Sequence, residues 1–175
     1  MAQPATVIAE TKHLRLVQRN GWSFVQRTST NRVACVIAQT PSGKVLLIEQ
    51  YRRPVDATVI ELPAGLVGDL GDQPNETIEH GAARELFEET GYVAGQWRQL
   101  ANLASCPGLT DEETTMLLAT ELRKDGPGGG DENENIVVHE VPIEKVDGWL
   151  AKAAIDGKMI DGRVYAGLYL LRTVS

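Results

Sequence analysis

Alternating apolar and polar residues predict two strands near the start of the chain. Leu14–Arg19 and Trp22–Arg27 both alternate in this way, and they flank the dipeptide Asn20-Gly21. Asn-Gly favours the positive backbone angles that a two-residue hairpin turn requires. The pattern therefore predicts an N-terminal β-hairpin within residues 1–30.

Two nearly continuous apolar runs follow, at residues 32–39 and 44–50. Such runs are typical of strands buried on both faces, so we expect helices on both sides of a sheet. The glycine-rich residues 124–131 predict a mobile loop. The chain is expected to form one α/β domain over residues 1–175, an α/β/α sandwich with a central mixed sheet. Further strands are predicted at 59–62, 97–103, 114–120 and 136–141, and helices at 143–154 and 162–174.

A further helix is predicted within residues 75–92. On a wheel of about 100° per residue, its two faces differ in character. Glu76 and Glu79 lie in the first turns, away from the charged arc, where carboxylates favour the helix dipole. The charged arc holds Arg84, Glu85, Glu88 and Glu89, and the opposite arc, suited to packing on a sheet, holds Ala82, Ala83, Leu86, Phe87 and Thr90.

The carboxylates of the charged arc repel one another. Glu85 and Glu89 are one turn apart, and neither has a Lys or Arg four residues later to relieve the repulsion. Mg²⁺ or Mn²⁺ would relieve it, because both ions favour carboxylate oxygens. Gly81 costs helix stability, but it leaves room for something bulky to approach the carboxylates. A solvated acidic helix face is the alternative that the pattern alone leaves open.

Composition narrows the possible partners. The chain has 175 residues, 42% of them hydrophobic, which suits one domain with a core. A net charge of −7 and the lack of a Lys/Arg run argue against nucleic-acid binding. An enzyme this acidic would need bound metal and a few placed arginines to hold an anionic substrate.

Three further observations concern the cellular location of the protein. No apolar run approaches the roughly 20 residues of a membrane span, which predicts that the protein does not enter a membrane. Residues 1–10 lack the basic and apolar stretches of a secretory signal. Cys35 lies in an apolar run and Cys106 in a loop, which gives no disulfide framework, so a cytoplasmic location is expected.

The residue sequence of the acidic stretch resembles a family motif. Glu76 is followed by seven residues and then by Arg84-Glu85-Leu86-Phe87-Glu88-Glu89-Thr90-Gly91-Tyr92. This resembles the Nudix box, E-x7-R-E-U-x-E-E-x-G-U, in which U is a bulky apolar residue. Every fixed position from Glu76 onward matches. The resemblance implies a Nudix hydrolase with the same α/β/α fold.

One departure from the motif concerns its first glycine. In the family pattern five residues separate a glycine from the first glutamate, and this chain has Leu70 at that glycine position. The counterpart is Gly65, in Leu-Pro-Ala-Gly-Leu, so residues 67–74 are interpreted as an inserted loop. Surface loops tolerate insertions at small entropic cost, so the chemistry of the helix is not affected.

Segments outside the box resemble the ADP-ribose pyrophosphatase branch of the Nudix hydrolases. They are L-I-E-Q-Y-R at 47–52, E-L-P-A-G-L at 61–66, the loop 105–112 and the acidic segment 131–136. By position, the resemblance implies that Glu85 and Glu89 hold metal with the Ala64 carbonyl, assisted by Glu88. Arg84 would orient the glutamates and Arg52 would bind the diphosphate. In the loop 105–112, Gly108 and Glu112 would contact the substrate, Glu112 at the terminal ribose, in its own site or in that of a partner subunit.

The resemblance also implies a general base in the acidic segment. The choice lies between Glu132 and Glu134. Glu134 is nearer to the predicted strand and would face solvent or substrate, whereas Glu132 lies further into the glycine-rich loop. In the resembling loop D-E-N-E the first glutamate carries the base role, so the resemblance makes Glu132 the predicted base. His13, His80 and His139 are too scattered in the sequence to suggest a metal site.

The implied activity is Mg²⁺-dependent cleavage of ADP-ribose to AMP and ribose 5-phosphate, with Mn²⁺ as a possible substitute. One alternative is hydrolysis of another nucleoside diphosphate sugar such as GDP-mannose. A second alternative is a non-catalytic regulator that binds ADP-ribose. The hairpin carries Trp22 and Phe24, which need burial, so a homodimer formed through residues 1–30 is predicted.

Overall fold

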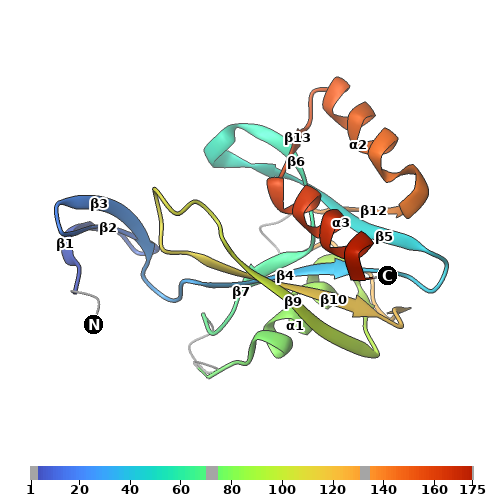
Figure 1. Ribbon diagram of the computed structural model, residues 1–175, viewed down its shortest axis with the longest axis horizontal. Coiled ribbons are helices and arrows are strands. Elements are labelled where there is room, and N and C mark those ends of the chain that lie inside the picture. Colours follow the sequence, from blue (N-terminus) through green and yellow to red (C-terminus); the bar gives the residue numbers. More distant parts are fainter. Residues whose placement is uncertain (1–3, 70–74, 131–134, 175) are drawn as a thin grey trace.

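The computed structural model describes residues 4–69, 75–130 and 135–174. Within these ranges the helices are α1 (Ile78–Thr90), α2 (Val146–Ile155) and α3 (Gly162–Val174), with 3₁₀ turns at Arg53–Val55 and Ile143–Lys145 (Figure 1). The strands are β1 (Thr6–Glu10), β2 (Leu14–Arg19), β3 (Trp22–Arg27), β4 (Arg32–Ala38), β5 (Lys44–Arg52), β6 (Ala57–Glu61), β7 (Ala64–Leu66), β8 (Tyr92–Val93), β9 (Gln96–Ala104), β10 (Glu113–Thr120), β11 (Arg123–Lys124), β12 (Val137–Pro142) and β13 (Met159–Ile160).

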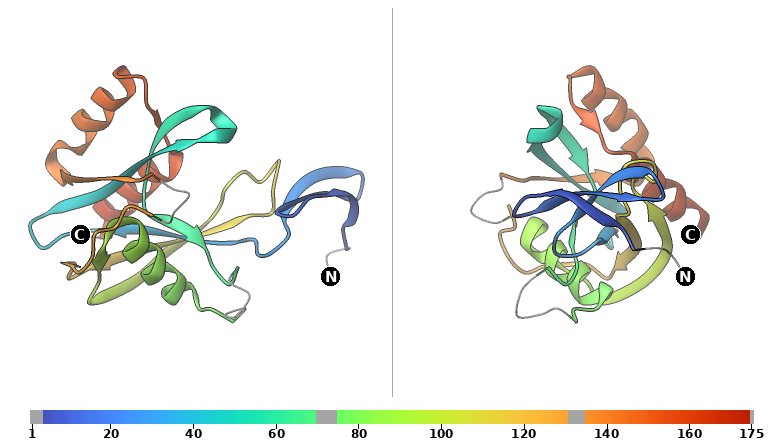
Figure 2. Two further views of the ribbon diagram at one scale, coloured as in Figure 1. Left: turned by 180° about the vertical axis from the view of Figure 1, so that it is seen from behind. Right: turned by 90° about the vertical axis from the view of Figure 1, so that its left-hand side faces the viewer.

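The body of the protein is an α/β/α sandwich, as predicted, but its middle layer holds two sheets instead of one. One has the order β7-β4-β10-β9 and the other β12-β5-β6-β13. Each is mixed, because β4 pairs with β10 and β6 with β13 in parallel while their other pairs are antiparallel. Gln39, the residue after β4, forms a bridge with Val45 near the start of β5, although the two strands belong to different sheets. Helix α1 lies on one side of the layer and α2 and α3 on the other (Figures 1 and 2).

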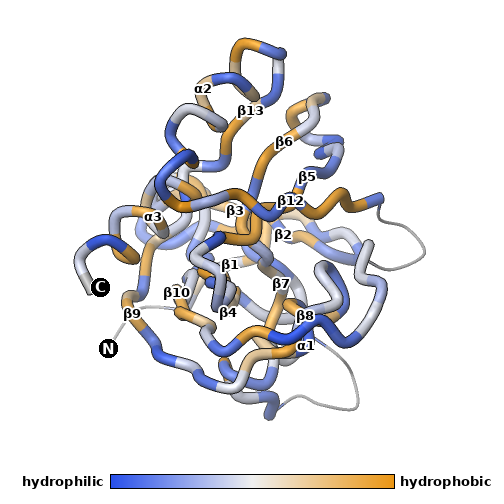
Figure 3. Tube along the Cα trace, turned by 90° about the vertical axis from the view of Figure 1, so that its right-hand side faces the viewer, coloured by the Kyte–Doolittle hydropathy of each residue, from blue (hydrophilic) through white to orange (hydrophobic). Residues whose placement is uncertain are grey.

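Strand β4 shows why this layer is covered on both faces. Successive side chains of a strand point to opposite sides. Cys35 and Ile37 join a core with residues of α2 and α3, whereas Ala34 and Val36 join a second core with residues of α1. This confirms the prediction that the apolar run is buried on both faces. Figure 3 shows the hydrophobic stretches of β6 and β13, of which β13 packs beside α2 and β6 beside α3.

The N-terminal strands form a separate three-stranded sheet, β1-β2-β3, at one end of the molecule (Figure 1). Asn20 and Gly21 have φ of 51° and 80°, which confirms the predicted hairpin turn. Strand β1 was not predicted, because its residues are all exposed and no turn signal marks it. The amide of Val25 donates to the carbonyl of Leu109 at 2.8 Å, which attaches this sheet to the loop between β9 and β10.

Among the described residues, no helix is both long and apolar enough to cross a membrane.

Candidate active site

Helix α1 carries most of the predicted site, and both of its ends are defined by local chemistry. Thr77 caps the N-terminus, because its hydroxyl accepts a hydrogen bond from the amide of His80 at 3.2 Å. Gly91 ends the helix with φ of 71°, a left-handed conformation that glycine adopts without strain. The buried residues of the helix are Gly81, Ala82, Leu86, Glu89 and Thr90.

Glu76 differs from its prediction. It lies before the first residue of α1, so the helical wheel did not apply to it. Its carboxylate is only 7% exposed and accepts hydrogen bonds from Nε of Arg84 at 3.2 Å and from the amide of Gly68 at 2.9 Å. Burial alone would raise the pKa of Glu76, but these donors outweigh it and hold the pKa below its ordinary value. Glu76 is therefore an anchor of the charged cluster and not a bystander of the helix dipole.

Arg84 is the centre of that cluster. Its Nη1 lies 2.7 Å from Oε1 of Glu85 and 3.1 Å from Oε2 of Glu88, and its Nη2 donates to the Leu66 carbonyl at 2.9 Å. Together with Glu76, these contacts fix the guanidinium on three sides. The glutamates have no Lys or Arg four residues later, but Arg84 relieves part of the repulsion from the preceding turn, because it pairs with Glu85 and Glu88.

The negative charge of the Glu85 carboxylate is only partly balanced by its pair with Arg84. Its side chain is only 14% exposed, and burial raises the pKa of its carboxyl to about 7. Arg84 opposes this increase in pKa, while the nearby charges of Glu88 and Asp69 add to it. A further positive charge beside Glu85 would therefore stabilise its ionised form.

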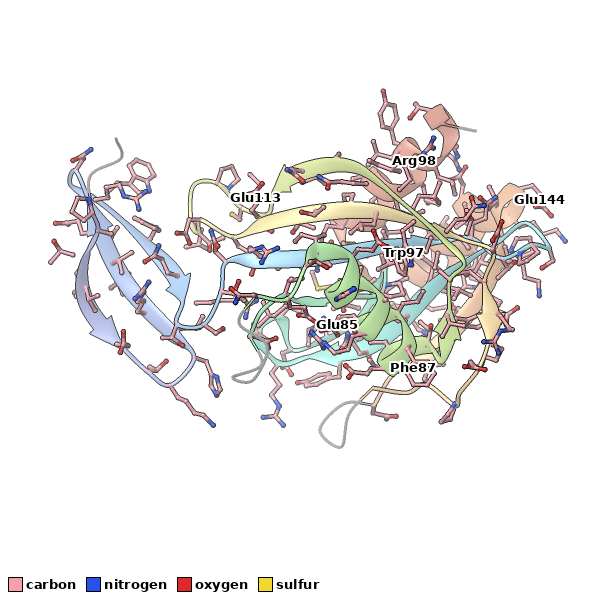
Figure 4. All side chains as sticks on the ribbon, turned by 90° about the horizontal axis from the view of Figure 1, so that it is seen from below. Glu85, Phe87, Trp97, Arg98, Glu113 and Glu144 are labelled. Carbon is pink, nitrogen blue, oxygen red and sulfur yellow. The ribbon has the colours of Figure 1, made fainter. Side chains whose placement is uncertain are left out.

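Glu89 lies deeper than the wheel suggested. It is 3% exposed, and its Oε2 accepts a hydrogen bond from the amide of Ala64, the first residue of β7, at 3.0 Å. The next residue, Gly65, lies against Glu85, since a Cβ built there would be 2.0 Å from Cδ of Glu85. The four residues predicted to hold metal thus lie together on α1 and at the start of β7. They are Ala64, Glu85, Glu88 and Glu89 (Glu85 is labelled in Figure 4).

The chemistry of these residues fits a hard divalent cation. Carboxylate and carbonyl oxygens are the ligands that Mg²⁺ and Mn²⁺ favour, and the raised pKa of Glu85 indicates a place where added positive charge is favourable. In the conformation described, no three His, Cys, Asp or Glu side chains of the described residues are arranged to hold one ion. Arg84 occupies oxygens of Glu85 and Glu88, so these carboxylates would have to turn from Arg84 towards the ion.

Two other predictions for this helix were wrong. Gly81 does not leave an open space, because a Cβ there would lie 2.7 Å from Cγ2 of buried Val67. Phe87 is not part of the packed face, since it is 41% exposed. It lies against Gly126 instead, where a Cβ would be 2.9 Å from Cζ of the ring (Figure 4).

The glycine-rich segment 124–131 was predicted to be mobile, but its described part is attached to the end of α1. The amides of Gly129 and Gly130 donate to the carbonyls of Glu89 and Glu88 at 2.8 and 3.0 Å. Carbonyls at a helix C-terminus have no partner within the helix, so this segment satisfies two of them. Glu132 and Glu134, the candidates for the base, lie outside the described residues.

The metal-binding candidates open onto a cleft of about 840 Å³ between α1, β6 and the start of α3. Predicted residues that line it are Arg52, Ala64, Arg84, Glu85, Glu88 and Glu112. Arg52 pairs with Glu61 at 2.8 Å, and Glu112 pairs with Arg27 at 2.8 Å. Gly108 lies in the loop between β9 and β10, where its carbonyl accepts a hydrogen bond from the Trp22 indole at 3.2 Å.

Sequence reasoning missed five charged residues of this cleft: Arg27, Glu61, Asp69, Asp161 and Arg163. For Glu61 a signal existed, because it is a charged residue at the end of the apolar run before Leu62-Pro63-Ala64-Gly65. Asp161 and Arg163 flank Gly162 at the predicted start of a helix. Their position beside the cleft depends on tertiary packing that no local pattern shows.

The fold and the cleft define an α/β/α protein with an acidic helix face and arginines around one cavity. A family model described as the NUDIX domain matches residues 29–162, and the chain belongs to this family.

Curated relatives differ in their described roles. A methanol dehydrogenase activator from Bacillus methanolicus is 37% identical over 111 residues, covering 63% of this chain and 57% of the relative. An ADP-ribose pyrophosphatase from Mycobacterium tuberculosis is 32% identical over 141 residues, covering 80% of this chain and 64% of the relative. A GDP-mannose pyrophosphatase from Klebsiella pneumoniae is 31% identical over 137 residues, covering 74% of this chain and 64% of the relative. The chain thus spans 57–64% of the length of these relatives.

A solved structure shares the fold. The crystal structure of an ADP compounds hydrolase matches with a TM-score of 0.71 at 21% sequence identity, and the match covers 99% of this chain and 95% of that chain.

Proposed function

We propose that this protein is a Mg²⁺-dependent pyrophosphohydrolase that cleaves ADP-ribose to AMP and ribose 5-phosphate, and that Mn²⁺ can replace Mg²⁺. The main support is the composition of one cleft, in which the carboxylates of α1 and the backbone of Ala64 share a cavity with Arg52. A diphosphate needs a metal to neutralise its charge and cationic donors to fix its orientation. Both kinds of group are available here.

The metal would be held by Glu85, Glu89 and the carbonyl of Ala64, with Glu88 assisting. When bound, it would neutralise the diphosphate and lower the pKa of a water molecule. Arg84 would orient the glutamates, since it already contacts Glu85 and Glu88. Arg52 would bind the diphosphate with the donors that its pair with Glu61 leaves free.

Glu132 is proposed as the general base. Gly130, two residues before it, is hydrogen-bonded to the carbonyl of Glu88 at 3.0 Å. In the resembling segment D-E-N-E the first glutamate carries the base role, which favours Glu132 over Glu134. Glu134, which is nearer to β12 in the sequence, is assigned to substrate contact.

A second cavity offers a place for the nucleobase. It has a volume of about 570 Å³, its lining includes Trp22 and Phe24, and it shares Glu112 with the cleft. Aromatic side chains provide stacking surfaces for a base. In this proposal Glu112, as the resemblance implies, contacts a ribose, and Gly108 helps to shape the surrounding loop through its bond with Trp22.

The proposal has two alternatives. Hydrolysis of GDP-mannose or another nucleoside diphosphate sugar would use the same metal and arginines and would differ only in the base and sugar contacts. A non-catalytic regulator that binds ADP-ribose would have no need for the complete set of glutamates.

Initial rates with Mg²⁺ over a panel of ADP-ribose, GDP-mannose, other nucleotide sugars and dinucleotides test these possibilities. We expect the highest kcat/KM with ADP-ribose, products AMP and ribose 5-phosphate, and loss of activity on chelation. A higher kcat/KM with GDP-mannose would select the first alternative. Binding of ADP-ribose without turnover would select the second.

A further inference from the structure

An acidic protein that binds a diphosphate needs cationic donors beyond its metal. The formal net charge is −7. Of the arginines that line the cleft, Arg84 is engaged by three glutamates and a carbonyl, and Arg27 is paired with Glu112, which is proposed to contact the ribose. The other two, Arg52 and Arg163, are also paired with carboxylates, but both lie beside the same one, Glu61.

Arg163 is held rigidly at the first turn of α3. Its Nε lies 3.1 and 3.0 Å from the two carboxylate oxygens of Asp161, and its Nη2 lies 2.5 Å from Oδ2. The backbone amide of Arg163 also donates to Asp161, at 2.7 Å. The side chain is 25% exposed and lines the cleft.

Arg52 is held in the same manner on β5. Its Nε lies 3.2 and 2.9 Å from the two carboxylate oxygens of Glu61, and its Nη2 lies 2.8 Å from Oε2. Glu61 is 4% exposed and is further fixed by Nε2 of Gln50 at 2.9 Å.

Glu61 also connects the two arginines. Its Oε1 lies 3.8 Å from Nη2 of Arg163, so both guanidinium groups flank one buried carboxylate. Each arginine uses its Nε and Nη2 edge for its own carboxylate, which leaves Nη1 outside the pair. An arginine fixed on one edge can offer its other edge to a phosphate oxygen at little entropic cost.

We propose that Arg163 is a second phosphate-binding arginine of the site, which acts beside Arg52 on the diphosphate of the substrate. This inference rests on the proposed function. The phosphate-binding role differs from a purely structural role, in which the pair of Arg163 with Asp161 would only stabilise the start of α3.

The same helix supplies a matched control. Nη2 of Arg172 lies 2.8 Å from both carboxylate oxygens of Asp147, at the far end of α3 and away from the lining of the cleft. A comparison of Arg163→Gln with Arg172→Gln therefore separates loss of an arginine–aspartate pair on α3 from loss of a donor in the cleft.

The experiment measures calorimetric binding of ADP-ribose, AMP and ribose 5-phosphate in EDTA, together with kcat and KM in Mg²⁺. We expect Arg163→Gln to weaken ADP-ribose binding and raise KM roughly 10- to 100-fold, as loss of a charge-assisted hydrogen bond predicts. The affinity for at least one product should fall as well. Arg172→Gln should leave all of these values unchanged.

Three outcomes would overturn the inference. The first is an unchanged Kd and KM in Arg163→Gln, when the wild type hydrolyses ADP-ribose. The second is a loss that disappears in an Arg52→Gln background, because Arg163 would then act only through Arg52. The third outcome applies if Arg163→Gln does not fold. Arg163→Lys then replaces it, because lysine keeps the charge without the planar donors, and an unchanged KM in Arg163→Lys would overturn the inference. A wild-type protein without any pyrophosphohydrolase activity would instead overturn the proposed function.

Discussion

The carboxylate of Glu89 accepts a hydrogen bond from the backbone amide of Ala64, with 3.0 Å between Oε2 and N. This contact joins the last turn of α1 to the first residue of β7. A buried carboxylate needs such a donor, because burial without one carries a large desolvation cost. The bond also brings a side-chain ligand and a backbone ligand of the proposed metal site next to each other.

The first prediction concerns this site. Glu85→Gln and Glu89→Gln should each weaken metal binding and lower turnover roughly 10²-fold or more, because each removes a charged oxygen ligand. In metal-free protein Glu85→Gln should not lower the melting temperature, since burial already disfavours the charged form of Glu85. Activity over a Mg²⁺ titration and thermal melts in EDTA measure the two effects. Glu79→Gln, on an exposed position of α1, is the control. Near-normal activity of either variant at limiting Mg²⁺ would contradict the metal assignment.

The second prediction concerns Gly81. Gly81→Ala should destabilise the protein by about 1–3 kcal/mol, because the new Cβ would lie 2.7 Å from Cγ2 of Val67, a stiff and buried side chain. Gly148→Ala in α2 is the matched control. It meets nothing within 4 Å and should stabilise by about 0.5–1 kcal/mol. Urea denaturation measures both variants. If Gly81→Ala were as stabilising as Gly148→Ala, the close contact with Val67 would not govern this position.

The sequence predicted those features that depend on local pattern. The hairpin at Asn20-Gly21, the doubly buried strand β4 and the helix carrying Glu85 and Glu89 all follow from turn chemistry or from periodicity. Each of these signals operates over a few neighbouring residues, so it can be read without knowledge of the fold.

The errors arose where long-range packing decides. Glu76 was placed on a wheel, although the cap at Thr77 starts the helix two residues later. Gly81 and the segment ending at Gly130 were interpreted from composition, whereas Val67 and the carbonyls of α1 determine their surroundings. Arg163 enters the cleft only because α3 packs beside β4 and β6.

The third prediction is a pH dependence of stability. Glu49 accepts hydrogen bonds from Lys158 at 2.5 Å and from His139 at 2.9 Å. Burial would raise the pKa of Glu49, but these two partners hold it below its ordinary value of 4.5. Its contribution to stability is therefore fully present above pH 4.5 and is lost as the pH falls through the lower, folded-state pKa.

The free energy of unfolding of wild type and Glu49→Gln, measured by denaturation from pH 3 to pH 7, tests this contribution. We expect wild type to be more stable at pH 7 and the difference to shrink below about pH 4.5. A difference that grew on acidification would show the opposite sign of linkage and contradict the assignment.

The fourth prediction is a homodimer formed through the N-terminal sheet. Phe24 is buried within its own chain, but Val7, Ile8 and Trp22 are 48%, 54% and 64% exposed. Exposed apolar residues grouped on one sheet favour association. Light scattering at micromolar concentration should give the dimer mass for wild type and the monomer mass for Ile8→Lys. The control, Ile155→Lys, alters an exposed residue at the end of α2 and should remain dimeric. A monomeric wild type would exclude the dimer.

The last prediction concerns the general base. The glycines before the acidic segment are fixed to the carbonyls of Glu88 and Glu89, so the chain enters that segment beside the proposed metal ligands. Glu132 follows this attachment by two residues, while Glu134 is closer to β12. Glu132→Gln should therefore lower kcat roughly 10²–10⁴-fold with little change in KM or metal affinity, as loss of a general base does. Glu134→Gln, the matched control in the same segment, should cost far less. The reverse order of effects would assign the base to Glu134, and two mild effects would mean that neither glutamate is the base.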